Sequence, residues 1–181
     1  MQITQTRLPG VLVLEPRRFH DPRGSFAETW RRERYEEAGL PGRFEQDNVS
    51  VSARGVVRGL HFQNPSPQGK LVTALSGAIF DVAVDLRRDS PTFGAWVGVE
   101  LSGDDLRQLW IPEGFAHGFQ ALTEETIVSY KCTAPYVPEA ESSIRWDDPR
   151  IGIEWPLTDS ILSPKDAGAP LLADLPPDRL F

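Results

Sequence analysis

Residues 46–70 read QDNVSVSARGVVRGLHFQNPSPQGK, and the organisation of the chain can be worked out from this stretch. β-Branched and aromatic residues dominate residues 56–62, which predicts a strand. The prolines and the glycine within residues 64–69 interrupt this pattern and predict a loop. The loop leads into a second strand that begins near Lys70. The stretch therefore predicts β structure on both sides of a tight connection.

His61 is the best candidate in this stretch for an acid–base residue, because the unperturbed pKa of histidine suits proton transfer near neutrality. A buried histidine with satisfied hydrogen bonds is an equally good interpretation of the stretch by itself. Strict alternation would put Arg58 and His61 on opposite faces of the strand. Gly59 lies between them, and a glycine inside a strand often marks a bulge that re-aims its neighbours. The stretch also supplies other polar groups: Lys70, Gln46, Asn48 and Gln63.

Length and composition predict a protein with one sizeable core. The chain has 181 residues, 40% of them hydrophobic, so we expect a single domain over residues 1–181. The formal net charge of −7 argues against nucleic acid or an anionic membrane as a partner, and an anionic small ligand would need local cations. The single cysteine, Cys132, excludes an internal disulfide, and no apolar run suggests a leader or a membrane span. These features predict a cytoplasmic protein.

Short strands separated by turns recur along the chain with little helix between them. We expect strands at residues 11–14, 25–30, 44–52, 71–75, 78–86, 96–101, 108–111 and 126–133, and a short helix at 31–38 that ends at Gly39. Residues 136–181 are too apolar for a disordered tail. We expect them to pack across the barrel, with a loop at 162–166 and a short terminal helix. The pattern predicts an all-β fold, an antiparallel sandwich or jelly-roll barrel with a few short helices.

The strands expected at residues 71–75 and 78–86 are separated only by Ser76 and Gly77, so we expect them to pair as a hairpin. In the second of these strands, Asp81 and Asp85 alternate onto a face that also carries apolar residues. That face is therefore mixed in character.

Metal binding is a natural first hypothesis for a jelly roll. Residues 112–117, PEGFAH, have the P-x-G-x-x-H form of the second cupin motif, which ends in His117. The first cupin motif requires an H-x-H pair, but here Gln63 takes the place of the second histidine after His61. Two imidazoles and a carboxylate could still form a metal site with open positions. Two cationic side chains accompany the same site, so we expect no metal.

Other catalytic classes lack their sequence signals. Cys132 has no histidine near it in sequence, and there is no G-x-S-x-G elbow. There is also no phosphate-binding Walker loop and no G-x-G-x-x-G motif, so nucleotide hydrolysis and dinucleotide redox chemistry are not indicated. Cofactor-free acid–base chemistry remains, with a histidine base, a tyrosine acid and a lysine that stabilises developing negative charge.

Several longer motifs follow one another along nearly the whole chain. They are F-x-D-x-R-G-x-F at residues 19–26, Q-x-N at 46–48, R-G-L-H-x-Q at 58–63, V-D-L-R-x-x-S-P-T-F-G at 84–94, P-x-G-F-A-H-G-F at 112–119 and S-x-K-D at 163–166. With these motifs the chain resembles the dTDP-4-dehydrorhamnose 3,5-epimerase family. The resemblance implies a metal-free, cupin-like jelly-roll barrel that works as a homodimer with shared active sites. It further implies that dTDP-4-keto-6-deoxyglucose is epimerised at carbons 3 and 5, a step in rhamnose precursor synthesis.

The resemblance also implies roles for individual residues. A 4-keto group acidifies the protons on both adjacent carbons, so a base can remove one of them and leave an enolate. His61 would be this base, with Asp166 as its orienting carboxylate. Lys70 would stabilise the enolate oxygen, and Tyr130 would return a proton from the opposite face. Without the resemblance, Tyr130 is better interpreted as a core-strand residue whose hydroxyl bonds a backbone carbonyl.

Further residues would contact the substrate if the resemblance holds. Arg23 and Arg58 would lie near the pyrophosphate, and Phe26 and Tyr136 are plausible aromatic partners of the thymine. In the family, part of the N-terminal segment around Arg23 reaches the site of the neighbouring subunit. His117 could equally stabilise a cupin turn. The other contacts implied are Glu28, Gln46, Asn48, Glu141, Lys165 and His117.

Other interpretations remain open at this point. The chain could be a non-catalytic cupin that binds a sugar or a nucleotide, although the presence of His61 and Tyr130 favours an enzyme. A metal-dependent cupin oxygenase is a weaker alternative. Some relatives epimerise only carbon 3, and others with this fold are 4-keto isomerases. Residues 144–149, IRWDDP, look like the double epimerase.

Overall fold

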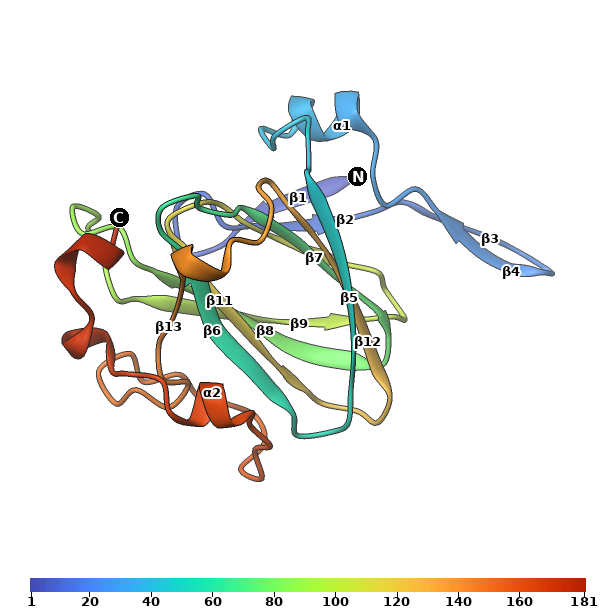
Figure 1. Cartoon of the computed structure of the whole chain (residues 1–181). Coiled ribbons are helices and arrows are strands. Elements are labelled where there is room, and N and C mark those ends of the chain that lie inside the picture. The colour runs from blue at the N-terminus through green and yellow to red at the C-terminus, as the bar shows by residue number, and fades with distance from the viewer.

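Two antiparallel β-sheets pack face to face in the computed structural model, which describes residues 1–181 (Figure 1). The six-stranded sheet has the order β1 (Gln2–Gln5), β2 (Leu12–Glu15), β10 (Gln108–Ile111), β7 (Lys70–Ser76), β12 (Thr126–Cys132) and β5 (Gln46–Ser52). The five-stranded sheet has the order β13 (Glu141–Ser143), β6 (Val57–Gln63), β11 (Phe115–Ala121), β8 (Ala78–Asp85) and β9 (Trp96–Ser102). This arrangement confirms the predicted all-β, cupin-like jelly-roll class.

Helices are few and short, as predicted. They are α1 (Arg32–Glu37), α2 (Pro164–Ala167) and the 3-10 turns η1 (Pro138–Ala140), η2 (Leu172–Asp174) and η3 (Pro177–Arg179). The loop predicted at residues 162–166 is wrong in part, because Ser163 caps α2: its Oγ accepts a hydrogen bond from the Asp166 amide at 3.1 Å. The terminal helix is likewise reduced to 3-10 turns. No helix is long and apolar enough to cross a membrane.

The main core lies between the two sheets. Inward-facing side chains of β7, β8, β10 and β11 join a cluster of 14 buried residues, among them Val72, Ala83, Leu109 and Phe119. Burial of such a side chain stabilises the fold by about 1.5–3 kcal/mol when the side chain is a Val, Leu or Phe. The hydrophobic runs of the sequence are therefore explained by one shared interior.

The outer face of the five-stranded sheet is buried as well. Phe62 and Val82 on this face pack with Ile144 and Ile151, which belong to the segment that follows β13. The segment that follows β13 and runs to the C-terminus, orange to red in Figure 1, crosses the same side of the sandwich. The expectation that residues 136–181 pack across the barrel is thus confirmed.

The hairpin predicted for residues 71–75 and 78–86 is wrong. β7 lies in the six-stranded sheet between β10 and β12, whereas β8 lies in the five-stranded sheet between β9 and β11. The chain changes sheets at Gly77, whose φ of +71° is a conformation that glycine adopts without strain. Alternation of apolar residues shows which face of a strand is buried, but it does not show which strand lies alongside.

A third, two-stranded sheet extends away from the sandwich. β3 (Arg18–Asp21) and β4 (Gly24–Ala27) form a hairpin that projects to the right in Figure 1. Its two aromatic side chains are exposed, Phe19 by 50% and Phe26 by 69%. We call residues 18–28, the hairpin with the residue that directly follows it, the arm.

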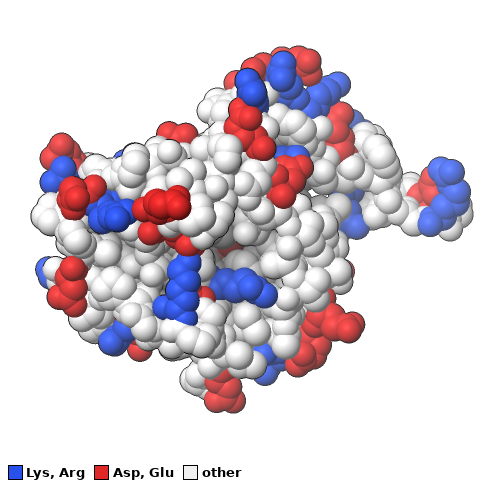
Figure 2. Space-filling view, in the orientation of Figure 1, with Lys and Arg blue, Asp and Glu red and all other residues white.

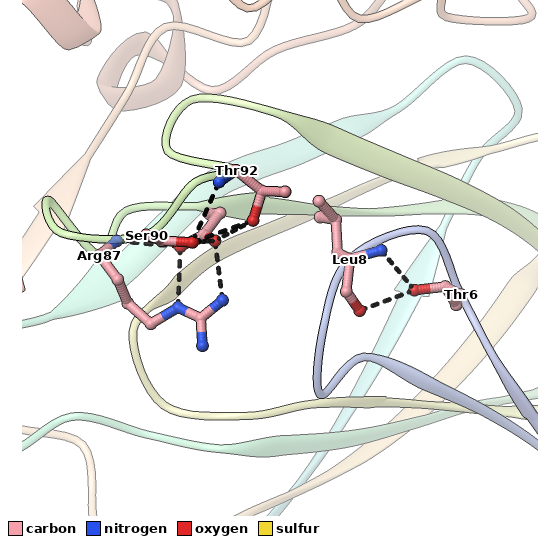
Figure 3. A network of polar contacts seen from close by, with 6 residues as sticks. Thr6, Leu8, Arg87, Ser90 and Thr92 are labelled. Atoms are coloured by element: carbon pink, nitrogen blue, oxygen red, sulfur yellow. Dashed lines mark hydrogen bonds and ion pairs between the residues drawn. The ribbon is translucent and has the colours of Figure 1, made fainter.

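The turn after β8 is organised by a buried carboxylate. Asp85 is fully buried and accepts hydrogen bonds from the Arg87 guanidinium, the Ser90 hydroxyl and the Thr92 hydroxyl, the shortest three at 2.7 Å (Figure 3). Burial raises the pKa of Asp85, but these hydrogen bonds together outweigh it and lower the pKa to about 2. Figure 3 also shows the smaller turn between β1 and β2, where Thr6 Oγ1 bonds both the amide and the carbonyl of Leu8.

Asp85→Asn is expected to destabilise the protein in a pH-dependent way. The carboxylate has a lower pKa in the folded state than in the unfolded state, so the stabilisation by its charge is complete above the unfolded pKa and is lost as the pH falls through the folded pKa. We expect the substitution to lower the free energy of unfolding at neutral pH by about 2 kcal/mol. The deficit should shrink as the pH falls from about 4 to about 2. Urea unfolding of both proteins over this range measures it, and a deficit that does not change with pH would contradict the prediction.

Candidate active site

A cavity of about 430 Å³ opens into the barrel between β6, β12 and residues 161–166. Most of its polar lining comes from the predicted site residues: Arg58, His61, Lys70, His117, Tyr130, Lys165 and Asp166. In Figure 2 basic side chains lie beside a hollow near the centre of the visible face, whereas acidic side chains are scattered over the rest of that face. The local cations that the acidic chain would need for an anionic ligand are therefore present.

A second hollow of about 230 Å³ adjoins the first. It shares His61, Lys70 and Tyr130 with the cavity and adds four more of the predicted residues: Gln46, Asn48, Tyr136 and Glu141. The structure thus brings together all the predicted site residues except Arg23, Phe26 and Glu28. We call the two hollows together the cleft.

His61 and Asp166 form a tight pair. Nε2 of His61 lies 2.6 Å from Oδ1 of Asp166, which is buried. Burial raises the pKa of Asp166, but the hydrogen bonds from His61 and Ser163 and the charge of His61 outweigh it, so the pKa lies below its usual value. A charged carboxylate that accepts from Nε2–H leaves Nδ1 as the ring nitrogen that can take a proton.

A bulge in β6 turns two side chains toward the same cavity. His61 pairs with His117 on β11, while Arg58 pairs with Phe119, so three steps along β6 match two along β11. Gly59 lies in the bulge with a φ of +120°, and a Cβ there would lie 2.6 Å from the Cα of Gly118. The bulge predicted at this glycine is confirmed, and it explains why Arg58 and His61 both line the cavity.

Lys70 is a buried cation without a partner. It is 8% exposed, and its ammonium takes part in none of the ion pairs or hydrogen bonds of the structure. Burial lowers its pKa, and the acidic groups of Cys132, Asp81 and Glu141 oppose this effect. Its three N–H donors are therefore available to a ligand.

Tyr130 projects from β12 into the cleft. Its ring centroid lies 6.4 Å from that of His117, and its hydroxyl forms no hydrogen bond within the chain. The interpretation in which this hydroxyl bonds a backbone carbonyl is therefore wrong. Burial raises the pKa of Tyr130, so the phenol stays protonated at neutral pH and can donate a proton.

Five predicted binding residues form hydrogen bonds with one another at the edge of the second hollow. Glu141 Oε2 accepts hydrogen bonds from the Tyr136 hydroxyl at 2.7 Å and from the Lys165 ammonium. The Gln46 side chain donates to Asn48 at 2.9 Å and accepts from the Tyr136 amide at 2.7 Å. These contacts hold polar groups from β5, β13 and α2 in place around the opening.

The arm keeps the three remaining residues away from the cleft of their own chain. Arg23 pairs with Asp21 at 2.6 Å at the tip of the hairpin, and Glu28 pairs with Arg34 at 2.8 Å. Phe26 lies exposed on β4. Their predicted contact with the substrate stays a prediction that requires a second subunit.

Sequence reasoning missed Asp81. Its Oδ1 lies 2.7 Å from Nε2 of His117, so the imidazole is tied to β8 and does not stabilise a turn. The available signal was its position on the mixed face of β8, where a carboxylate among apolar residues needs a partner. No group of three or more His, Cys, Asp or Glu side chains is arranged so as to hold a metal ion.

The jelly-roll fold and the acid–base groups gathered in its barrel define a class, that of the cupin-like isomerases. Within this class the chain belongs to the dTDP-4-dehydrorhamnose 3,5-epimerase family, whose model matches residues 5–174. The enzyme of this name from Methanothermobacter thermautotrophicus is 56% identical over 165 residues, which cover 90% of this chain and 89% of the relative. That from Salmonella typhimurium is 54% identical over 175 residues, which cover 95% and 96%.

A solved structure and a further sequence relative are also similar to this chain. A dTDP-6-deoxy-D-glucose-3,5-epimerase from Legionella pneumophila, in complex with dTDP-4-keto-L-rhamnose, superimposes with a TM-score of 0.96 at 51% identity. The match covers 99% of this chain and 96% of that one. A dTDP-4-dehydrorhamnose 3-epimerase from Streptomyces niveus is 42% identical over 96% of this chain and 85% of the relative.

Proposed function

We propose that this protein epimerises dTDP-4-keto-6-deoxyglucose at carbons 3 and 5 and so forms dTDP-4-keto-L-rhamnose. The observation that carries the proposal is the meeting of three groups in one cavity: the His61–Asp166 pair, the unpartnered Lys70 ammonium and the unpartnered Tyr130 hydroxyl. Membership of the family supports the substrate and the two positions.

The first half of the reaction is proton abstraction. The 4-keto group acidifies the protons on carbons 3 and 5, and Nδ1 of His61 removes one of them. The Asp166 carboxylate stabilises the imidazolium that forms. The remaining negative charge moves to the keto oxygen, where a N–H of the buried Lys70 ammonium donates to the enolate.

The second half returns a proton from the opposite face. Tyr130 is the donor, because burial keeps its hydroxyl protonated and no group of the chain competes for that proton. Delivery from the face opposite His61 inverts the carbon. Solvent then takes the proton from His61 and returns one to Tyr130. After this reset the same pair of residues can serve the second carbon, if the sugar ring presents it to the cavity.

The nucleotide binds beside the reacting groups and extends from the cavity into the second hollow. Arg58 and Lys165 line the cavity and supply positive charge for the pyrophosphate. Arg58 is itself held by Ser52 Oγ at 3.1 Å and by the Val51 carbonyl at 3.2 Å. The polar residues of the second hollow, Gln46, Asn48, Tyr136 and Glu141, contact the remainder of the nucleotide.

The working form is a homodimer in the cytoplasm, and the arm completes the partner's site with Arg23, Phe26 and Glu28. Two features support this assembly. The arm leaves its own sandwich with an exposed aromatic residue, and the edge strand β5 exposes Val49 by 66% and Val51 by 62%. Exposed apolar side chains of this kind are typical of a surface that another chain covers.

Epimerisation of carbon 3 alone is the second candidate, because the relative from Streptomyces niveus is named a 3-epimerase. Incubation with dTDP-4-keto-6-deoxyglucose in D₂O separates the two. Deuterium at both carbons supports the double epimerase, whereas deuterium at carbon 3 alone supports the alternative.

His61→Asn is expected to abolish proton abstraction and to leave nucleotide binding intact. Removal of a positioned general base typically lowers the rate by about 10²- to 10⁴-fold. Asp166→Asn should show a similar defect, because the imidazole loses its orienting carboxylate. Deuterium exchange measures the first step, and the dissociation constant of dTDP is the control. Exchange at close to the wild-type rate in His61→Asn would exclude this residue as the base.

Tyr130→Phe is expected to separate exchange from inversion. His61 still removes a proton, so deuterium enters the substrate, but reprotonation from the far face fails and little epimer forms. Stability should hardly change, because the hydroxyl bonds nothing in the chain. Tyr35→Phe is the matched control, since the Tyr35 hydroxyl lies 2.6 Å from Gln108 and outside the cleft. That variant should lose about 1 kcal/mol of stability and keep its epimer yield. A normal yield from Tyr130→Phe would show that another group is the donor.

Mixed dimers test whether Arg23 serves the partner's site. Arg23→Ala and His61→Asn proteins are unfolded, mixed and refolded, so that about half of the dimers are heterodimers. If the arm crosses, each heterodimer has one intact site, and the mixture should recover about a quarter of the wild-type activity. A mixture of Arg58→Ala and His61→Asn is the control, because both residues line one cavity and no intact site can form. No recovery in the first mixture would place Arg23 at its own chain's site or outside the site.

A further inference from the structure

A second Asp–His pair lies deeper in the barrel than His61 and Asp166. Asp81 on β8 is 0% exposed, and its Oδ1 lies 2.7 Å from Nε2 of His117. Its Oδ2 is buried and has no hydrogen-bond partner. On either side along the same face, Ile79 and Ala83 pack into the main core.

Packing alone does not explain this carboxylate. A buried carboxylate destabilises a fold unless hydrogen-bond donors or positive charges compensate it. The donor here is the imidazole of His117, which also lines the cavity. Asp81 is thus joined to the cavity through one hydrogen bond.

The geometry fixes the position of the proton on His117. A carboxylate accepts, so Nε2 carries the hydrogen, and Nδ1 of the neutral ring is an acceptor that forms no hydrogen bond within the chain. Burial lowers the pKa of His117 and Asp81 opposes this, while the charges of Lys70 and His61 lower the pKa further. The ring is therefore neutral at neutral pH.

We infer that Asp81 is a positioning residue that holds His117 as the Nε2–H tautomer, so that Nδ1 accepts a hydrogen bond from a hydroxyl group of the bound sugar. This inference rests on the proposed function of the cavity. The Lys70 ammonium can only donate and suits the keto oxygen, whereas Nδ1 of neutral His117 can only accept and suits a hydroxyl. The Lys70 ammonium and Nδ1 of His117 together distinguish the keto oxygen from the hydroxyl groups on the adjacent carbons, and so they orient the sugar.

Asp81 acts on Lys70 as well as on His117. The groups that face these two side chains come from several elements. They are Arg58 and His61 on β6, Asp81 on β8, Tyr130 and Cys132 on β12, Glu141 on β13, and Lys165 and Asp166 on α2. Among them Asp81 is one of the acidic groups whose charge raises the pKa of Lys70 against the effect of burial.

The tautomer can be observed in the wild-type protein without substrate. The chain has 3 histidines, so a long-range ¹H–¹⁵N spectrum contains three sets of ring signals, which single substitutions of His20 and His61 assign. We expect the signals of His117 to be those of a neutral Nε2–H ring at neutral pH. A protonated ring, or the Nδ1–H tautomer, would overturn the inference whatever the activity of the enzyme.

Asp81→Asn tests the effect on catalysis. The amide can donate to Nε2 and so reverse the tautomer, and the acceptor for the sugar hydroxyl is lost. We expect kcat/KM to fall about tenfold, with no change in the dissociation constant of dTDP. The alkaline limb of the kcat/KM profile reports Lys70, since its pKa is lowered and that of Tyr130 is raised. Loss of the nearby negative charge lowers the pKa of Lys70 further and should move this limb to lower pH.

Asp85→Asn is the matched control. Asp85 is equally buried on the same face of β8, but its partners Arg87, Ser90 and Thr92 lie outside the cleft. That variant should lose stability and keep the wild-type pH profile. An unchanged profile and unchanged kcat/KM in Asp81→Asn would overturn the inference and leave the proposed function standing. Failure of the wild-type protein to exchange deuterium would instead reject the proposed function.

Discussion

The close approach of two backbones at Gly59 and Gly118 is the constraint on which the cleft depends. A Cβ at Gly59 would lie 2.6 Å from the Cα of Gly118, so the bulge in β6 can form only because neither position carries a side chain. The extra residue rotates the strand between Arg58 and His61 and brings both side chains to one cavity. Asp166 in turn is placed by contacts with this strand, through His61 and the backbone of Gly59. The bulge at Gly59 thus determines the position of the proposed base, His61, and also that of its carboxylate partner, Asp166.

The jelly roll also explains how an acidic chain can hold an anionic intermediate. The barrel interior removes Lys70 from water without giving it a partner, and two carboxylates, Asp81 and Asp166, each bond an imidazole. Charges inside such a low-dielectric site interact more strongly than they would at the surface. The net charge of −7 is therefore compatible with a cavity that stabilises negative charge.

Much of this structure could be predicted from the sequence, because alternation and turn residues mark strands directly. The jelly-roll class, helix α1 and the bulge at Gly59 agree with the prediction. Eleven of the fourteen predicted site residues lie together in the cleft, and their roles stay predictions. The failures have a common physical cause. Periodicity describes one strand at a time, so it could not show that β7 and β8 belong to different sheets, nor that Asp81 lies beneath His117. It also could not show that the arm leaves the sandwich, because a hairpin pattern does not specify what the hairpin packs against.

The bonds among Tyr136, Glu141 and Lys165 have a consequence for the thermodynamics of recognition. In the free protein these polar groups already satisfy one another, with Glu141 accepting from both neighbours. A ligand that reaches them exchanges existing hydrogen bonds for new ones and gains little enthalpy from the exchange. It also loses little entropy, because the side chains are ordered beforehand. Such an opening favours ligands whose donors and acceptors can replace the hydrogen bonds that these three side chains now make with one another. Because the exchange adds little binding free energy, the ligand is not held tightly. Weak binding of this kind suits a protein that must release a product almost identical to its substrate.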